Sequence, residues 1–155
     1  MPAIEVVTEI LAPIEVCFDL ARSIDLHTSS MAGTKERAVG GVTSGLIGLG
    51  QEVTWEARHF LVRQRLTSRI TLFDRPRHFR DSQVRGAFRR FDHDHFFHED
   101  DGLTVMRDVF DYQSPMGLLG RFADTLFLAR YMRRLIERRG LAIKAAAEHR
   151  SGAVP

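Results

Sequence analysis

The chain has 155 residues, of which 44% are hydrophobic and 27% are charged, and its formal net charge is +2 at pH 7. This length fits a single domain with a sizeable core, and the composition excludes a disordered chain. Cys17 is the only cysteine, which excludes an intrachain disulfide. Because no apolar run approaches the roughly 20 residues of a membrane span and no signal peptide is recognisable, we expect a cytoplasmic protein with no membrane span.

The N-terminal region predicts one strand and two helices. Apolar residues recur along residues 4–11, which favours a strand. Pro13 suits the first turn of a helix, where its missing N–H costs nothing. Residues 13–22 then carry Val16, Cys17, Leu20 and Ala21 at helical spacing, and a shorter helical segment follows over residues 25–31.

The middle of the chain predicts a series of antiparallel strands over residues 35–39, 52–60, 64–73, 78–85, 88–98 and 103–112. Turn signals separate them, including a break at Gly40–Gly41 and a hairpin turn over residues 99–102. In the 64–73 strand the alternation places Leu66, Ser68, Ile70 and Leu72 on one face.

The C-terminal region predicts a long amphipathic helix over residues 117–139. We expect Gly140 to interrupt it before a second segment over 141–149, and residues 151–155 to form a frayed tail. A single helix cannot cover a broad flat sheet, but a curved sheet can wrap around it. The predicted fold is therefore α+β, a helix-grip domain over residues 1–150 with a curved antiparallel β-sheet around the C-terminal helix and a cavity between them.

Several segments resemble one branch of the START/SRPBCC superfamily, which includes polyketide cyclase/dehydrase-like proteins. Residues 83–97 (QVRGAFRRFDHDHFF) resemble its G-P-F-x-x-W-x-H-x-H-x-F motif, and residues 114–120 (SPMGLLG) resemble its entry into the last helix. Residues 53–60, Asp108 and Tyr112 also match, whereas Ala87 and Phe91 replace the usual Pro and Trp. The resemblance implies the helix-grip fold and an internal ligand site, but it does not fix the ligand or an activity.

Strand alternation places the candidate site residues on one face of the sheet. His93 and His95 share a face with Phe91 and Phe97, while Asp92 and Asp94 point the other way. Alternation on the other strands and the apolar face of the last helix together predict a ligand site that is mostly aromatic, with some polar residues. The predicted ligand-binding residues are Trp55, His59, Asp81, Gln83, Phe91, His93, His95, Met106, Tyr112, Phe122 and Leu126.

Two functions from different classes follow from this site. The first is a binding or carrier protein for a small hydrophobic or aromatic molecule, without a cofactor. The alternative is a cyclase or dehydratase acting on a polyketide-type or related carbonyl substrate, with His93, His95 and Asp108 as catalytic residues. The two histidines lie about 7 Å apart along a strand, so we expect each to need a separate partner, with Asp108 the best-placed carboxylate. A purely structural network across the strands would use the same residues.

Three other patterns have simpler interpretations. A His-x-His pair can bind zinc, with His59 as a third ligand, but nothing in the sequence fixes the remaining geometry and we predict no metal. The glycine-rich segment 40–50 lacks the G-K-[ST] ending of a phosphate loop, so we interpret it as a flexible connection and a candidate lid. The arginines of residues 130–139 are interpreted as the solvated face of a packed helix rather than a nucleic-acid site. A monomer and a homodimer both remain open.

Overall fold

The computed structural model describes residues 3–114 and 127–153 of the chain. Seven strands form one sheet in the order β1-β7-β6-β5-β4-β3-β2, and all neighbours are antiparallel. The strands are β1 (Ala3–Ile10), β2 (Arg37–Gly41), β3 (Glu52–His59), β4 (Val62–Asp74), β5 (His78–Arg85), β6 (Arg90–Asp100) and β7 (Leu103–Gln113). The helices are α1 (Ile14–Ala21), α2 (Ile24–Ser30), the 3-10 turn η1 (Ala32–Thr34) and α4 (Ala129–Arg150).

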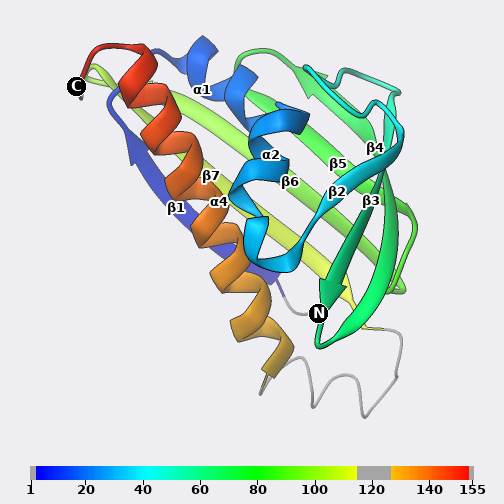
Figure 1. Ribbon diagram of the computed structural model, residues 1–155. Coiled ribbons are helices and arrows are strands. Elements are labelled where there is room, and N and C mark those ends of the chain that lie inside the picture. The colour runs from blue at the N-terminus through cyan, green and yellow to red at the C-terminus, as the bar shows by residue number, and fades with distance from the viewer. Residues whose placement is uncertain (1–2, 115–126, 154–155) are drawn as a thin grey trace.

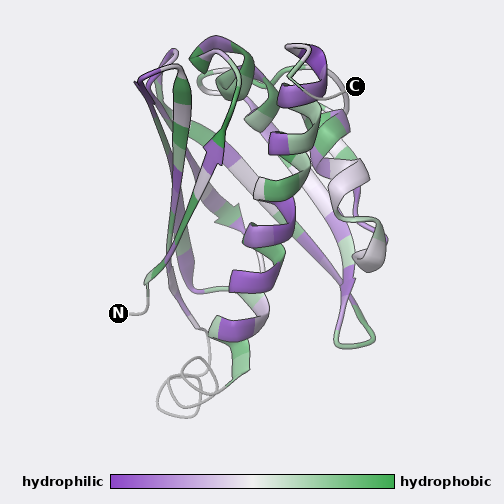
Figure 2. Cartoon of the chain, turned by 90° about the vertical axis from the view of Figure 1, so that its left-hand side faces the viewer, coloured by the Kyte–Doolittle hydropathy of each residue, from purple (hydrophilic) through white to green (hydrophobic). Residues whose placement is uncertain are grey.

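The helices of the described residues lie on one side of the curved sheet. Figure 1 shows α4 crossing this face, with α1 and α2 beside it. Hydrophobic and hydrophilic residues alternate along the strands and along α4 (Figure 2), as expected for elements with one covered face. The predicted helix-grip fold class, a curved antiparallel sheet with a long C-terminal helix, is confirmed.

The core between sheet and helices has two parts. In one, Phe18 of α1 packs with Ile143 of α4 and Met106 of β7. In the other, Ile136 of α4 packs with Phe110 of β7 and their neighbours. The alternating burial of β1, in which every second residue from Ile4 is buried, shows the strand period that the sequence predicts. Among the described residues, no helix is long and apolar enough to cross a membrane.

Irregular strand geometry overturns two local predictions. The pairing of β4 with β5 shifts register between Ile70 and Leu72. The shift leaves Leu72 43% exposed and turns Phe73 inward, against Phe18, because an extra residue reverses the facing of those after it. Gly40 and Gly41 lie within β2 rather than ending it, since the strand runs over Arg37–Gly41 with a register shift of its own.

Helix α4 continues through Gly140, so the predicted interruption there is wrong. A Cβ atom at this position would lie 2.7 Å from the Thr8 Oγ1 atom of β1. The missing side chain therefore lets helix and strand approach closely, which explains a glycine inside a helix. Residues 115–126, which include most of the predicted start of the helix, lie outside the described residues, and residues 151–153 form a turn after α4.

Candidate functional site

A cavity of about 430 Å³ lies between the sheet and α4. Side chains from five strands, from α2 and from α4 line it, so the curvature of the sheet and the crossing of α4 create it. Its apolar wall includes Trp55, Ala57, Phe91, Phe110, Leu135 and Ile136. Such a volume lies in the range of small-molecule sites.

Trp55 forms part of the wall together with a residue of α2. The His27 ring stacks on the Trp55 indole with ring centroids 4.1 Å apart and an interplanar angle of 19°. The Nε2 atom of His27 lies 2.7 Å from a carboxylate oxygen of Glu36, which follows η1. All three residues line the cavity, so a stacked pair and a buried carboxylate form one polar corner of an apolar wall.

His59 lies at another part of the wall, next to α4. Its Nδ1 atom shares a 2.6 Å hydrogen bond with the hydroxyl of Tyr131. Burial lowers the pKa of His59, so the imidazole is neutral at physiological pH. Phe60, half exposed in the β3–β4 turn, packs on Tyr131 and Phe127 and extends this aromatic group toward the surface.

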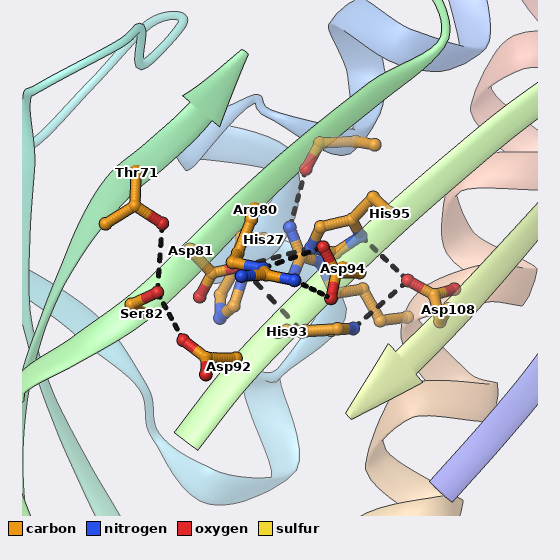
Figure 3. Close-up of polar contacts among 12 residues, drawn as sticks. His27, Thr71, Arg80, Asp81, Ser82, Asp92, His93, Asp94, His95 and Asp108 are labelled. Carbon is orange, nitrogen blue, oxygen red and sulfur yellow. Dashed lines mark hydrogen bonds and ion pairs between the residues drawn. The ribbon is translucent and has the colours of Figure 1, made fainter. Parts of the chain in front are cut away.

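Two histidines and two aspartates meet on the central strands. Asp81 of β5 pairs across the sheet with His93 of β6, and His95 pairs with Asp108 of β7. Nε2 of His93 lies 3.1 Å from Oδ1 of Asp108, and Nε2 of His95 lies 3.1 Å from Oδ1 of Asp81. Nδ1 of His95 also approaches Oδ1 of Asp108, at 2.7 Å, without hydrogen-bond alignment. Figure 3 shows both imidazoles reaching Asp108.

The distance between the two imidazoles corrects one geometric expectation. The two imidazole centroids lie 3.9 Å apart, much closer than the strand spacing suggests. The rings lean toward each other, and both lie close to Asp108. Each still has its own hydrogen-bond partner, as expected: His93 bonds to Asp108 and His95 bonds to Asp81. His95 is 1% exposed, and its ring stacks on that of Phe79.

The four groups differ in charge. Burial opposes a charge on His95, but the contacts with Asp108 and Asp81 outweigh it and raise its pKa. Burial and the neighbouring His95 lower the pKa of His93. Burial favours neutral carboxyl groups, yet the two histidines hold the pKa values of Asp81 and Asp108 below the usual range. Both carboxyl groups are therefore ionised at neutral pH, and His95 keeps its proton to a higher pH than His93 does.

The predicted site residues divide into three groups. Trp55, His59, Asp81, Phe91 and His93 line the cavity. Gln83, His95, Met106 and Tyr112 are not part of its wall: the last three are fully buried, and Gln83 donates a hydrogen bond to the Phe88 carbonyl oxygen. Phe122 and Leu126 lie outside the described residues.

Sequence reasoning missed three polar residues of the wall that lie outside the central strands. His27, Glu36 and Arg139 all reach the cavity, although they lie far apart in the chain. Arg139 is not fully solvated as expected for that helix face, because its guanidinium donates to the carbonyl oxygen of Ala21 at 2.6 Å. Only the position of His27 on the predicted short helix offered a signal, and nothing in the sequence showed which strand that helix faces.

The glycine-rich segment, a candidate lid, lies away from the cavity in this structure. Residues 42–51 are absent from the cavity wall. Ile47 is buried in the core, and backbone hydrogen bonds tie the segment to Arg22, Ile24 and Ile70. The segment instead covers the end of the core near α1 and α2.

Comparison with known proteins rests on structure alone, since no family model and no curated protein matches the sequence. The TTHA0849 protein of Thermus thermophilus superposes with a TM-score of 0.74 at 17% identity, covering 94% of this chain and 99% of that one. This chain has a helix-grip fold. Ginseng major latex-like protein 151 from Panax ginseng matches with a TM-score of 0.69 at 12% identity over 94% and 97% of the two chains.

A third helix-grip structure, Ara h 8.0201, matches with a TM-score of 0.67 at 12% identity, covering 94% of this chain and 97% of its own. These likenesses extend over almost the whole chain and support the helix-grip fold. At such low identity they establish the fold and leave function to the residues of the cavity.

Proposed function

We propose that this protein binds a small hydrophobic or aromatic molecule in the cavity between the sheet and α4. The observation that carries the proposal is the apolar cavity itself, with Trp55 and Phe91 on the sheet side and Leu135 on the helix side. A ligand that buries about 200 Å² of apolar surface there gains roughly 5 kcal/mol from leaving water. Part of that gain offsets the loss of translational and rotational freedom.

The polar residues of the wall add selectivity to this binding. His27 with Glu36 forms one polar corner, and Asp81 with His93 forms another. A ligand with one polar group can satisfy a corner while its remainder fills the apolar space. A fully apolar ligand leaves these groups without a new partner, so we expect amphipathic aromatic molecules to bind more tightly than hydrocarbons of the same size.

A second candidate function is proton-transfer catalysis on a carbonyl compound, as in a cyclase or dehydratase. One observation favours it: His93 lies on the cavity wall as a neutral imidazole whose Nε2–H donates to Asp108, which leaves Nδ1 as a proton acceptor. Exchange of the α-protons of an aromatic ketone with deuterium should then fall about a hundredfold or more in His93→Gln. No exchange above buffer in the unsubstituted protein would exclude this candidate.

Binding is tested by filling the cavity. Trp55 is the only tryptophan of the chain and lies on the wall, so its fluorescence reports an added apolar probe such as anilinonaphthalene. Ala57→Phe places a ring into the space, and we expect it to weaken probe binding at least about tenfold, since overpacking removes the room for the ligand. Ala145→Leu, on the exposed side of α4, should leave the affinity unchanged.

A thermal melt of each variant separates lost binding from lost folding. Ser68→Leu, at another wall position, gives a second test where Ala57→Phe unfolds. Equal probe affinity in the unsubstituted protein and in a folded cavity-filling variant would show that the probe binds elsewhere.

A further inference from the structure

Asp81, His93 and His95 bring three metal-ligating groups together. One nitrogen from each imidazole and one oxygen of Asp81 lie within 4.8 Å of one another. The Asp81 oxygen is 3.1 Å from Nε2 of His95 and 3.9 Å from Nδ1 of His93. Two ligands bound to one tetrahedral zinc ion lie roughly 3.4 Å apart. The two distances from Asp81 lie within about half an ångström of that value, and the two imidazole nitrogens need to approach each other through small side-chain rotations.

Asp108 lies behind both imidazoles. Its Oδ1 atom is 3.1 Å from Nε2 of His93 and 2.7 Å from Nδ1 of His95, in each case the nitrogen that is not directed at Asp81. Histidines that bind metals nearly always donate the N–H of their second ring nitrogen to a carboxylate or carbonyl oxygen, which fixes the ring and makes it a stronger ligand. Here the buried Asp108 carboxylate accepts a hydrogen bond from His93 and lies within contact distance of Nδ1 of His95.

The surrounding packing holds the rings in this orientation. His95 stacks on Phe79 with centroids 4.2 Å apart, and His93 meets Phe110 edge to face at 5.4 Å. All of these residues belong to adjacent strands of fixed register. The cluster is therefore organised before any ion arrives, which lowers the cost of binding one.

From this geometry we infer that Asp81, His93 and His95 form a site for a first-row divalent transition metal ion, such as Zn²⁺ or Fe²⁺. Two imidazoles and one carboxylate suit these ions, whereas Ca²⁺ and Mg²⁺ prefer oxygen ligands. The ion would take the place of the proton that His95 and Asp81 now share. Because Asp81 and His93 line the cavity, the remaining coordination positions face a bound molecule or water.

This assignment differs from the absence of metal that the sequence predicts. The sequence offered His59 as a third ligand, but that residue is bonded to Tyr131 on another part of the wall. Asp81 instead comes from the neighbouring strand, directly opposite His93. The inference does not depend on the hydrophobic ligand, since the ion is tested without one.

The test uses the full chain and Zn²⁺ alone. Calorimetric titration of the metal-stripped protein should show one Zn²⁺ bound per chain, and Co²⁺ should give a visible absorption band at the same stoichiometry. Asp81→Asn and His95→Gln each remove a ligand. Asp108→Asn removes a residue that only contacts the ligands, and it should weaken Zn²⁺ binding about 10- to 100-fold. Asp81→Asn and His95→Gln should each weaken it more than that.

His98→Gln is the matched control, because His98 is exposed on the same strand and should keep the affinity unchanged. Circular dichroism establishes that each variant is folded, and Asp81→Asn remains informative where the change at His95 unfolds the chain. Failure of the folded protein to bind Zn²⁺ or Co²⁺ would overturn the site. A loss in His98→Gln as large as that in Asp81→Asn would also overturn it, because the ion would then lie on the surface.

Discussion

His27 illustrates how the surroundings decide the charge of a single residue in the cavity wall. Burial lowers its pKa most, and the nearby Arg139 lowers it further, while Glu36 and Asp81 act in the opposite direction. The net shift is downward, so His27 is neutral and donates its Nε2–H to Glu36. Burial resists ionisation of Glu36, but the contact with His27 outweighs it and keeps the pKa of that carboxyl low.

This charge state predicts how stability depends on pH. Unfolded His27 takes up a proton below about pH 6.5, whereas the folded protein resists it, so the free energy of unfolding contributed by His27 is present above pH 6.5 and decreases as pH falls. His27→Gln keeps a donor for Glu36 but cannot titrate. We therefore expect a shallower loss of stability between pH 7 and pH 5, measured by urea unfolding.

The control for this prediction is Ala145→Leu, which changes an exposed residue of α4 without altering a titratable group and should leave the slope as it is. Burial also lowers the pKa of His59, and its contribution to the pH dependence of the free energy of unfolding is the same in both variants. Identical pH profiles for His27→Gln and the unsubstituted protein would show that His27 is not held neutral.

At the level of secondary-structure elements, the contact between α4 and β1 decides how closely the helix lies on the sheet. Gly140 is buried where the helix passes Thr8. Alanine would favour the helix by about 1 kcal/mol, but its methyl group would lie 2.7 Å from Thr8 Oγ1. Overpacking of this kind costs about 1–3 kcal/mol, so the clash should prevail.

A double-mutant cycle separates the two effects. Gly140→Ala should lower the free energy of unfolding by about 1 kcal/mol in the unsubstituted protein. In a Thr8→Ala background the clash is gone, and the same change should be neutral or stabilising. Chemical unfolding of the four proteins gives the coupling energy. Equal effects of Gly140→Ala in both backgrounds would contradict the close-contact explanation.

Elements with a regular period were predictable, and irregular ones were not. Alternation along a strand correctly placed Trp55, Phe91 and His93 on the concave face. The same rule failed at Leu72, because a register shift is set by pairing with the neighbouring strand rather than by the strand's own sequence. The element types over most of the chain followed from hydrophobic pattern and turn residues.

Long-range contacts limited how much of the site could be predicted. The stacking of His27 on Trp55 joins a helix to a strand 28 positions later, and no local pattern encodes it. The convergence of His93 and His95 depends on side-chain rotation around Asp108, which strand spacing alone does not describe. The types of residue in the site were therefore accessible from sequence, whereas their pairing required the fold.

Across the whole molecule, the two faces of the sheet have different roles. The face away from α4 carries ion pairs such as Arg80 with Asp94 and Arg37 with Glu56. In Figure 3 Thr71, Ser82 and Asp92 form a chain of polar contacts. The face toward α4 carries the core and the cavity. This division accounts for many arginines at a net charge of only +2, because acidic partners balance them.

The central claim is that ligand binding takes place inside the cavity, and NMR spectroscopy tests it most directly. Titration of isotope-labelled protein with the probe should shift the indole N–H of Trp55 and the signals of Ala57, Leu135 and Ile136, all on the cavity wall. Residues of the opposite face, such as Arg80, should stay unchanged. Shifts confined to the exposed turn at Phe60 and Leu61, with Trp55 unaffected, would contradict an internal binding site.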